Sequence, residues 1–333
     1  MPDSLTAPAP ATGLIEGFLC DGQGASRPLT PAELVANPLM KPEGKPFIWL
    51  HFALEAARGW VPDNLDLSPS TLKALFADET RPRFTQYDDR LLMNLRGVNF
   101  NEGEGHEDMV SLRVHLDKDR LITVRRQKSV AVESIRENMR RGRAPKNTGV
   151  LLLRIISGLT DKIEPVVDAL ADRVDVFEEL SLERELDDLR GQLSEMRHDA
   201  IVFRRYIAPQ RDAVARFSHH ESPLLPESAR NAAREEADRI TRVVEELDIV
   251  RERAAVITEQ LAARRADEMN RNMMIISVVS AVFLPLGFLT GLLGINVGGM
   301  PGADSEVAFW LVVAACFGLG AGLVLIFKRM GWI

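Results

Sequence analysis

Cysteine is nearly absent from this sequence, which has only Cys20 and Cys316 among its 333 residues. Two cysteines so far apart exclude a disulfide framework and a cysteine-rich zinc site. The sequence also lacks a nucleophile motif, a phosphate-binding loop and an HExxH pattern, so we do not expect an enzyme. Residues 1–13 have neither the basic start nor the apolar core of a signal peptide, and their proline and alanine content predicts a disordered tail.

Charge is missing from a long stretch near the C-terminus. Residues 272–303 contain no Asp, Glu, Lys or Arg, and 273–293 within them are almost wholly apolar. A second uncharged run covers 307–327. A helix needs about 20 apolar residues to cross the hydrocarbon core of a membrane. Two adjacent runs of this length predict a transmembrane hairpin over 272–333 in contact with lipid, rather than a pair of buried helices in a soluble protein.

The charged residues around these runs predict the orientation of the hairpin. Basic residues flank the outer ends of both runs: Arg264, Arg265, Arg271, Lys328 and Arg329. The segment between the runs has only Asp304 and Glu306. Both termini are therefore expected in the cytoplasm. The four charged residues after position 271 cancel, so the net charge of −7 lies in residues 1–271. An acidic cytoplasmic part attracts cations and argues against nucleic acid as a partner.

Residues 14–148 alternate helix and strand signals, which predicts a cytoplasmic α/β domain. Pro46–Leu54 is an apolar, aromatic-rich run with strand character, and two strand pairs are expected around Asp88-Asp89 and around 117–119. Thr30 and Ser68 stand before short helical segments as capping residues. The fold class is therefore an α+β domain, followed by long stalk helices over 149–271 and the membrane hairpin.

The stalk shows one break, at Ser218–Ala229, which contains two prolines. Beyond it nothing interrupts a helix until Pro285, so one helix is expected over 229–293, about 100 Å long at 1.5 Å per residue. Small and apolar residues recur along it in steps typical of a coiled-coil seam: Ala233, Ala237, Ile240, Val244, Leu247, Ala254 and Leu261. We expect this seam to bring copies of the chain together.

One face of the first apolar run is small, polar or flexible. Its members recur every three or four residues: Asn270, Met273, Ser277, Ser280, Leu284, Gly287 and Gly291. This stripe is either a helix–helix contact or the lining of a pore. Because two spans cannot enclose a water path, a pore would require several copies around an axis.

The residues that follow the first run resemble a known family. Gly294-Ile295-Asn296 closes the run, and a short loop and a second apolar run complete the chain. This arrangement resembles the two-transmembrane GxN metal-ion transporters of the CorA superfamily. The continuation VGGMPG at 297–302, and the segments ETRPRF, LLMNLRGVNFN, DMVSLRVHL and RLITVRR, are most similar to its ZntB zinc-transporter branch.

The resemblance implies a homopentameric funnel in the bacterial inner (plasma) membrane, with the first spans around the pore and no cofactor. Gly294, Ile295 and Asn296 would form the outer mouth, where amide oxygens suit a hydrated divalent cation. Zinc is the expected ion, with a magnesium or cobalt channel of the CorA type as the alternative. Zinc-branch members are thought to couple transport to protons, but the stripe has no Cys, His or carboxylate that could bind zinc directly or titrate.

Other segments are weaker candidates for function. Glu102–Asp108 gathers carboxylates around His106 and is expected to be a solvated loop, with a cation site as the alternative. His219, His220 and Glu221 could form a zinc sensor at the stalk break. The acidic run Asp175–Leu189 is expected to be a solvated helix face or to line a funnel. A membrane-anchored structural or signalling protein would explain the stalk but neither the stripe nor the GIN motif.

Overall fold

The structure is a computed structural model that describes residues 12–40, 46–78, 80–87, 90–182, 189–221, 224–295, 302 and 305–332. The chain divides into two compact units, Met1–Ile257 and Thr258–Ile333. Residues 1–11 of the predicted tail lie outside the described part. Thr12 and Gly13 are already buried, and the Gly13 carbonyl accepts a hydrogen bond from the Ala53 amide, so the ordered domain starts before the predicted residue 14.

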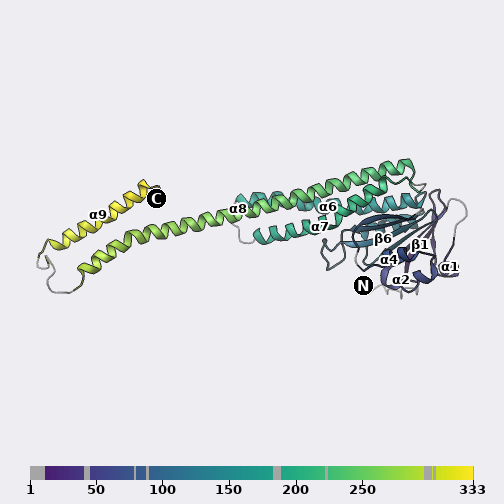
Figure 1. The fold of residues 1–333 in the computed structure, drawn as a ribbon, viewed down its shortest axis with the longest axis horizontal. Helices are drawn as coiled ribbons and strands as arrows, with labels where there is room; N and C mark the ends of the chain where they lie inside the picture. The colour runs from purple at the N-terminus through teal and green to yellow at the C-terminus, as the bar shows by residue number, and fades with distance from the viewer. Residues whose placement is uncertain are drawn as a thin grey trace. The chain divides into compact units, whose positions relative to one another are not determined.

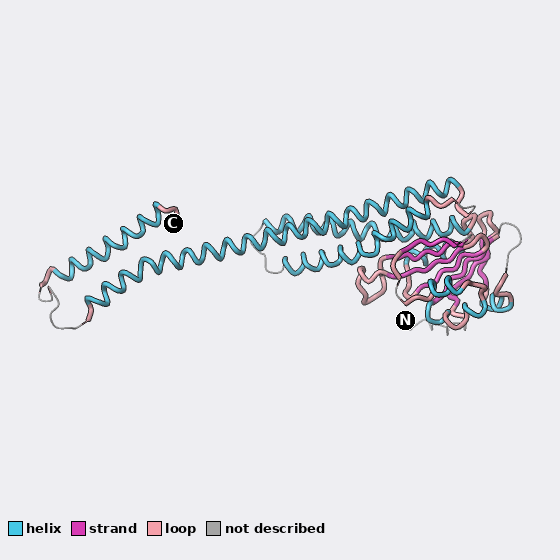
Figure 2. The backbone as a smooth tube through the Cα atoms, viewed as in Figure 1, coloured by secondary structure: helices cyan, strands magenta, loops and turns pink. Residues whose placement is uncertain are grey.

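The first unit is built on one sheet of seven strands in the order β2-β1-β3-β7-β6-β5-β4 (Figures 1 and 2). The strands are β1 (Leu14–Cys20), β2 (Ser26–Leu29), β3 (Phe47–Ala53), β4 (Arg83–Tyr87), β5 (Arg90–Gly97), β6 (Val110–Leu116) and β7 (Arg120–Arg125). The central pair β3–β7 is parallel and the other described pairs are antiparallel. The predicted strand at 46–54 and both predicted strand pairs are confirmed, whereas β1 and β2 were not predicted.

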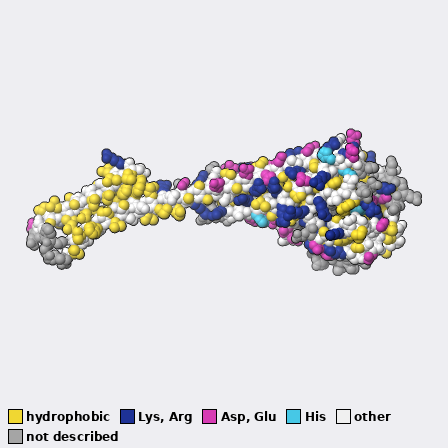
Figure 3. All heavy atoms as spheres, viewed as in Figure 1, with side chains coloured by type: hydrophobic (Ala, Val, Ile, Leu, Met, Phe, Trp, Pro, Cys, Tyr) yellow, Lys and Arg dark blue, Asp and Glu magenta, His cyan; other side chains and the backbone are white. Residues whose placement is uncertain are grey.

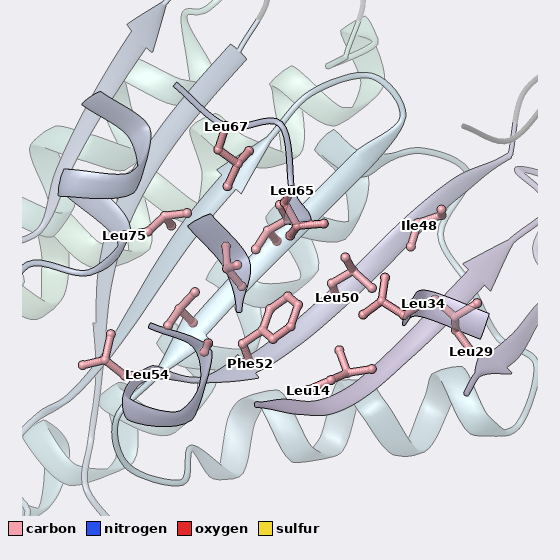
Figure 4. Packing of buried hydrophobic residues seen from close by; sticks show 14 of the residues in the cluster. Leu14, Leu29, Leu34, Ile48, Leu50, Phe52, Leu54, Leu65, Leu67 and Leu75 are labelled. Carbon is pink, nitrogen blue, oxygen red and sulfur yellow. The ribbon is translucent and has the colours of Figure 1, made fainter. Parts of the chain in front are cut away.

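Four short helices cover one face of the sheet: α1 (Pro31–Ala36), α2 (Leu54–Ala57), α3 (Val61–Asn64) and α4 (Pro69–Leu75). They contribute Leu34, Leu54 and Leu75 to an apolar core that includes Leu50 and Phe52 of β3 (Figure 4). The predicted caps are present. The Thr30 side chain accepts a hydrogen bond from the Glu33 amide, and the Ser68 side chain accepts one from the Thr71 amide, which satisfies otherwise free helix N–H groups.

Three longer helices cover the opposite face: α5 (Val130–Arg140), α6 (Thr148–Leu182) and α7 (Leu189–Ser218). Helix α5 contacts β2, α6 contacts β5 and β7, and α7 contacts β4 and β5. Trp49 is fully buried on this side and stacks on Phe18 at 5.7 Å. Of the predicted acidic run at 175–189, residues 175–182 belong to α6 and Leu189 belongs to α7, whereas residues 183–188 lie outside the described part.

Helix α8 runs from Glu227 to Leu293 and confirms the single long helix expected from the sequence. In the first unit, ion pairs join it to its neighbours: Arg239 Nη2 lies 2.7 Å from Asp161 and 2.6 Å from Glu164 of α6. Arg204 of α7 lies 2.6 Å from Asp248 of α8. The predicted seam residues are buried inside the chain, from Ala233 to Leu261. The expectation that the seam joins separate copies is therefore wrong, because α6 and α7 of the same chain lie along this helix (Figure 1).

Candidate ion pathway on the membrane-spanning helices

The second unit contains the apolar end of α8 and helix α9 (Ala308–Arg329), the two described helices that are long and apolar enough to cross a membrane. Large apolar side chains stand exposed on both, among them Phe283, Leu284 and Phe317. Figure 3 shows this as a hydrophobic surface over the two helices, in contrast to the charged surface of the first unit. The predicted pair of spans is thus present as two helices with apolar outer surfaces.

Aromatic side chains lie at both ends of α9, where a spanning helix would meet the lipid headgroups. Phe309 and Trp310 are in edge-to-face contact at 5.4 Å at one end. Phe327 stacks on Trp332 at 5.6 Å at the other end, beside Lys328 and Arg329. Tryptophan is enriched at membrane interfaces because its ring is apolar and its N–H is polar. The arrangement favours an α9 that spans the membrane over one buried in a partner protein.

The side of α8 that faces α9 can be identified from burial. On α8 the partly buried residues include four at helical spacing: Val278, Val282, Leu286 and Leu289. On α9 the partly buried residues include Val312, Cys316, Gly320, Leu323 and Phe327. A Cβ added to Gly320 would lie 3.8 Å from Leu286 Cδ1, so the two faces meet at this glycine. Sequence reasoning did not select Gly320, although its glycine neighbours at 318 and 322 are a pattern typical of close helix packing.

The predicted pore-lining stripe occupies the other side of α8. Asn270, Met273, Ser277, Ser280, Leu284, Gly287 and Gly291 are all exposed in the chain. At 3.6 residues per turn, Ser280 points roughly 160° away from Val282 around the helix axis. A Cβ added to Gly287 or Gly291 would meet nothing within 4 Å. The stripe is therefore not the contact between the two spans of one chain, and it is free to face other copies or water.

Two hydroxyl groups on this part of α8 are bonded to their own helix. The Ser277 hydroxyl donates to the Met273 carbonyl at 2.8 Å, and the Thr290 hydroxyl donates to the Leu286 carbonyl at 2.9 Å. These bonds hide the hydroxyl protons from lipid and leave oxygen lone pairs on the surface. Pro285 lies inside α8 without ending it, as the sequence predicted. The described stripe therefore offers oxygen acceptors and no ionisable group.

Helix α8 ends at the start of the GIN motif. The Gly294 amide donates to the Gly291 carbonyl at 3.2 Å, and a Cβ on Gly294 would lie 3.0 Å from the Thr290 carbonyl oxygen. Glycine therefore suits this close approach of backbone to backbone. Ile295 is exposed. Asn296, the predicted polar group of the outer mouth, lies outside the described residues, so its role stays a prediction.

The other candidate metal sites do not assemble. Across the described residues, no three His, Cys, Asp or Glu side chains converge on a position for a metal ion. His219 Nδ1 lies 2.8 Å from the Ala215 carbonyl, whereas the His220 ring packs 5.9 Å from Phe84. In the loop at 102–108, His106 meets Phe100 edge-on at 5.0 Å, and Glu104 accepts a hydrogen bond from Asn99. The zinc-sensor hypothesis at the stalk break is thus not supported by the described geometry.

Comparison with known proteins identifies relatives along almost the whole chain. The sequence profile of the family described as "CorA-like Mg2+ transporter protein" matches residues 44–329. The divalent cation transporter CmaX of Pseudomonas aeruginosa is 35% identical over 326 residues, which is 96% of this chain and 97% of the relative. The zinc transport protein ZntB of Pectobacterium carotovorum is 32% identical over 324 residues, with 97% of each chain covered.

Solved structures agree with the sequence relatives. The structure of the full-length CmaX protein matches with a TM-score of 0.84 at 34% identity, over 96% of this chain and 98% of that one. The CorA magnesium transporter of Methanocaldococcus jannaschii matches with a TM-score of 0.78 over 95% of this chain and 98% of that one. At 19% identity, the latter match establishes a shared fold. The predicted fold, an α/β domain followed by long helices and two C-terminal apolar helices, is confirmed.

Proposed function

The chain belongs to the CorA-like transporter family, close to proteins named ZntB and CmaX, and we propose that it transports divalent metal cations, zinc among them, across the inner membrane of a bacterium. The observation that carries the proposal is the division of α8 into two faces. One face packs on α9 at Gly320, and the opposite face presents the small and polar stripe, which no described residue of the chain covers. A pathway between several copies of the stripe follows from this division.

The chemistry of the stripe favours passage of a hydrated ion. Its described members have no carboxylate, imidazole or thiolate, the groups that bind zinc directly in proteins. Hydroxyl, amide and backbone oxygens accept hydrogen bonds from water that surrounds an ion. Discrimination between ions would then depend on the size and hydration of the ion at the Asn296 mouth. Zinc is favoured over other divalent ions by the likeness to the ZntB relatives.

A homopentamer is the proposed assembly, because one pair of spans cannot surround a water path. Apolar side chains stand exposed on the stalk helices of the first unit and are available to a neighbouring copy: Val176, Leu180, Ile249 and Val256. Exposed apolar residues at helical spacing are typical of helix–helix interfaces. These residues replace the buried seam as the proposed contacts within the pentamer.

The proposed orientation places both termini in the cytoplasm. Arg264, Arg265 and Arg271 precede the apolar end of α8, and Lys328 and Arg329 end α9. Basic residues are retained on the cytoplasmic side of a membrane. The GIN motif then opens to the outside, and the acidic first unit lies on the cytoplasmic side, where its charge attracts cations.

We also propose that transport is coupled to protons, and a transport assay with and without a pH gradient tests this separately from zinc transport itself. The described stripe has no titratable side chain, so coupling would require protonation outside the pore. The alternative is a passive magnesium or cobalt channel of the CorA type, with no dependence on a pH gradient.

Reconstitution of the purified protein into liposomes tests the proposal. Zinc, cobalt and magnesium entry should each be followed with an ion-sensitive dye, with and without a pH gradient. We expect zinc entry that depends on the protein. Magnesium entry without zinc entry would support the CorA-type alternative, and entry of none of the three ions would contradict a transport function.

A further inference from the structure

Arginine side chains crowd around one cavity in the first unit. The cavity has a volume of about 410 Å³ and is lined by Arg81, Arg96, Arg126 and Arg205 together with neutral polar residues. Among the described lining residues, Asp78 is the one carboxylate, and it is already paired with Arg58 at 2.5 Å. This surplus of positive charge is unexpected in a protein whose net charge is −7.

The fold brings these arginines together from distant parts of the sequence. Arg96 lies near the end of β5, Arg126 directly follows β7, and Arg205 lies on α7. The C-terminal ends of β5 and β7 lie at the same end of the sheet, because β6 runs antiparallel between the two strands. The cavity is therefore a product of the tertiary fold, and the sequence alone gave no signal for it.

Arg96 is the inner arginine of the cavity, and two backbone carbonyls and an aromatic ring are among the groups that it contacts. The Arg96 guanidinium donates to the carbonyls of Met109 and Thr80, each at 2.7 Å, and lies 4.7 Å from the centre of the Tyr206 ring. The three other lining arginines, Arg81, Arg126 and Arg205, are exposed to solvent, and Arg126 lies 3.6 Å from Glu55. The cavity thus has one arginine held at its floor and three exposed arginines at its rim, an arrangement suited to capture of an anion from solution.

A buried arginine behind the wall adds to the charge. Arg113 is 1% exposed and donates to the Ser111 hydroxyl and to the Ala77 carbonyl at 3.0 and 2.8 Å. Its Nε–H has no acceptor among the described residues. Burial, followed by the charges of Arg96, Arg126 and Arg58, lowers the pKa of Arg113 to about 10, and the charge of Asp78 opposes this shift. A buried cation is costly unless negative charge lies nearby.

We infer that this cavity binds a phosphate-bearing anion with at least two phosphate groups, either inorganic or part of a nucleotide. Guanidinium groups match phosphate oxygens with two parallel hydrogen bonds, and a diphosphate can use several arginines at once. The Tyr206 ring already packs against Arg96 and Arg205, so the arginines rather than base stacking would provide the affinity. This binding is independent of the proposed ion transport.

Calorimetric titration of the full-length protein in detergent tests the inference, with pyrophosphate and ADP as probes in a metal-free acetate buffer. The variants Arg126→Gln and Arg205→Gln each remove one exposed rim arginine, and we expect each to weaken binding by about tenfold or more. The control Arg141→Gln removes an equally charged, exposed side chain that pairs with Glu137 outside the cavity. We expect it to bind as the wild type does.

The two probes distinguish the source of the phosphate. Equal affinity for pyrophosphate and ADP would support recognition of the phosphates alone, and tighter ADP binding would support a nucleotide. Three results would overturn the inference: no saturable binding to the wild type, an equal loss in Arg141→Gln, or displacement of pyrophosphate by an equal concentration of chloride.

Discussion

Replacing His115 with leucine should remove much of the acid sensitivity of the first unit. His115 is 1% exposed on β6, and neither ring nitrogen has a hydrogen-bond partner among the described residues. Burial lowers its pKa to about 4, with Asp117 opposing this and Arg120 and Arg90 adding to it. The folded protein therefore holds a neutral ring at pH values where the unfolded chain takes up a proton.

The size of the effect follows from the two pKa values. Above the ordinary value of 6.5, His115 is neutral in both states and does not change stability. Between that value and about 4 the unfolded chain binds the proton and the folded chain does not, so the free energy of unfolding falls as the pH falls. At about pH 5 this amounts to about 2 kcal/mol. Such a change corresponds to about 4–8 °C in the melting temperature of a domain of this size.

Thermal unfolding of the full-length protein in detergent, followed from about pH 7.5 to pH 5, measures this effect. We expect His115→Leu to match the wild type at the higher pH and to melt several degrees above it at the lower pH. His51 is also buried, and burial and the charges of Arg125 and Arg136 hold its pKa well below its ordinary value, so some acid sensitivity should remain. The exposed His198→Leu variant is the matched control. The reasoning would be refuted if the melting temperature of His115→Leu fell between the two pH values by as much as that of the wild type.

This prediction also bears on proton coupling. A loss of zinc transport at low pH could come from unfolding of the first unit instead of from a coupled proton. If His115→Leu restores transport at low pH, the pH dependence belongs to the stability of the domain. If transport in the variant keeps the wild-type pH dependence, a coupled proton is the better explanation.

Three further changes test the membrane helices and the stalk. Asn296→Ala should retain assembly and lose ion flux, because a ring of amide oxygens at about 1 kcal/mol for each hydrogen bond is removed; intact flux would move selectivity elsewhere. Gly320→Leu should lower the melting temperature in detergent, since overpacking costs roughly 1–3 kcal/mol, whereas Gly318→Leu, where an added Cβ meets nothing within 4 Å, should not; equal effects would contradict the assigned face. Arg239→Gln should lower the melting temperature of the first unit more than Arg141→Gln does, because Arg239 forms ion pairs with Asp161, Glu164 and Glu236. Equal melting temperatures of the two variants would show that the stalk does not depend on this cluster.

Local sequence signals predicted the elements that depend on neighbouring residues. The Thr30 cap, the strand at 46–54 and the helix that ends at Leu293 follow from side-chain pattern and capping chemistry, and all three are confirmed. The length of the two apolar runs was enough to identify α8 and α9 as candidate spans. In each case, the interactions that stabilise the element join residues close in the sequence, or the prediction depends only on the length of an apolar run.

Long-range pairing was not predicted, because its stabilisation comes from contacts that sequence spacing does not reveal. Strand β2 is four residues long, and β1 contains a glycine, so neither has a strong pattern of its own. The parallel pairing of β3 with β7 joins residues about 70 apart in sequence, as in Leu50 with Ile122. The stalk seam was assigned to the wrong partner for the same reason: its spacing predicts a buried face but not which helix buries it.

The most direct test of the proposed pathway compares two cysteine variants at the same depth on α8. Ser280→Cys places a thiol on the stripe, and Val282→Cys places one on the face that packs toward α9, both with Cys316 changed to serine. A positively charged, water-soluble thiol reagent is then added to liposomes that transport zinc. We predict that it blocks transport by Ser280→Cys and leaves Val282→Cys unaffected. Block of Val282→Cys with no effect on Ser280→Cys would contradict a pathway lined by the stripe.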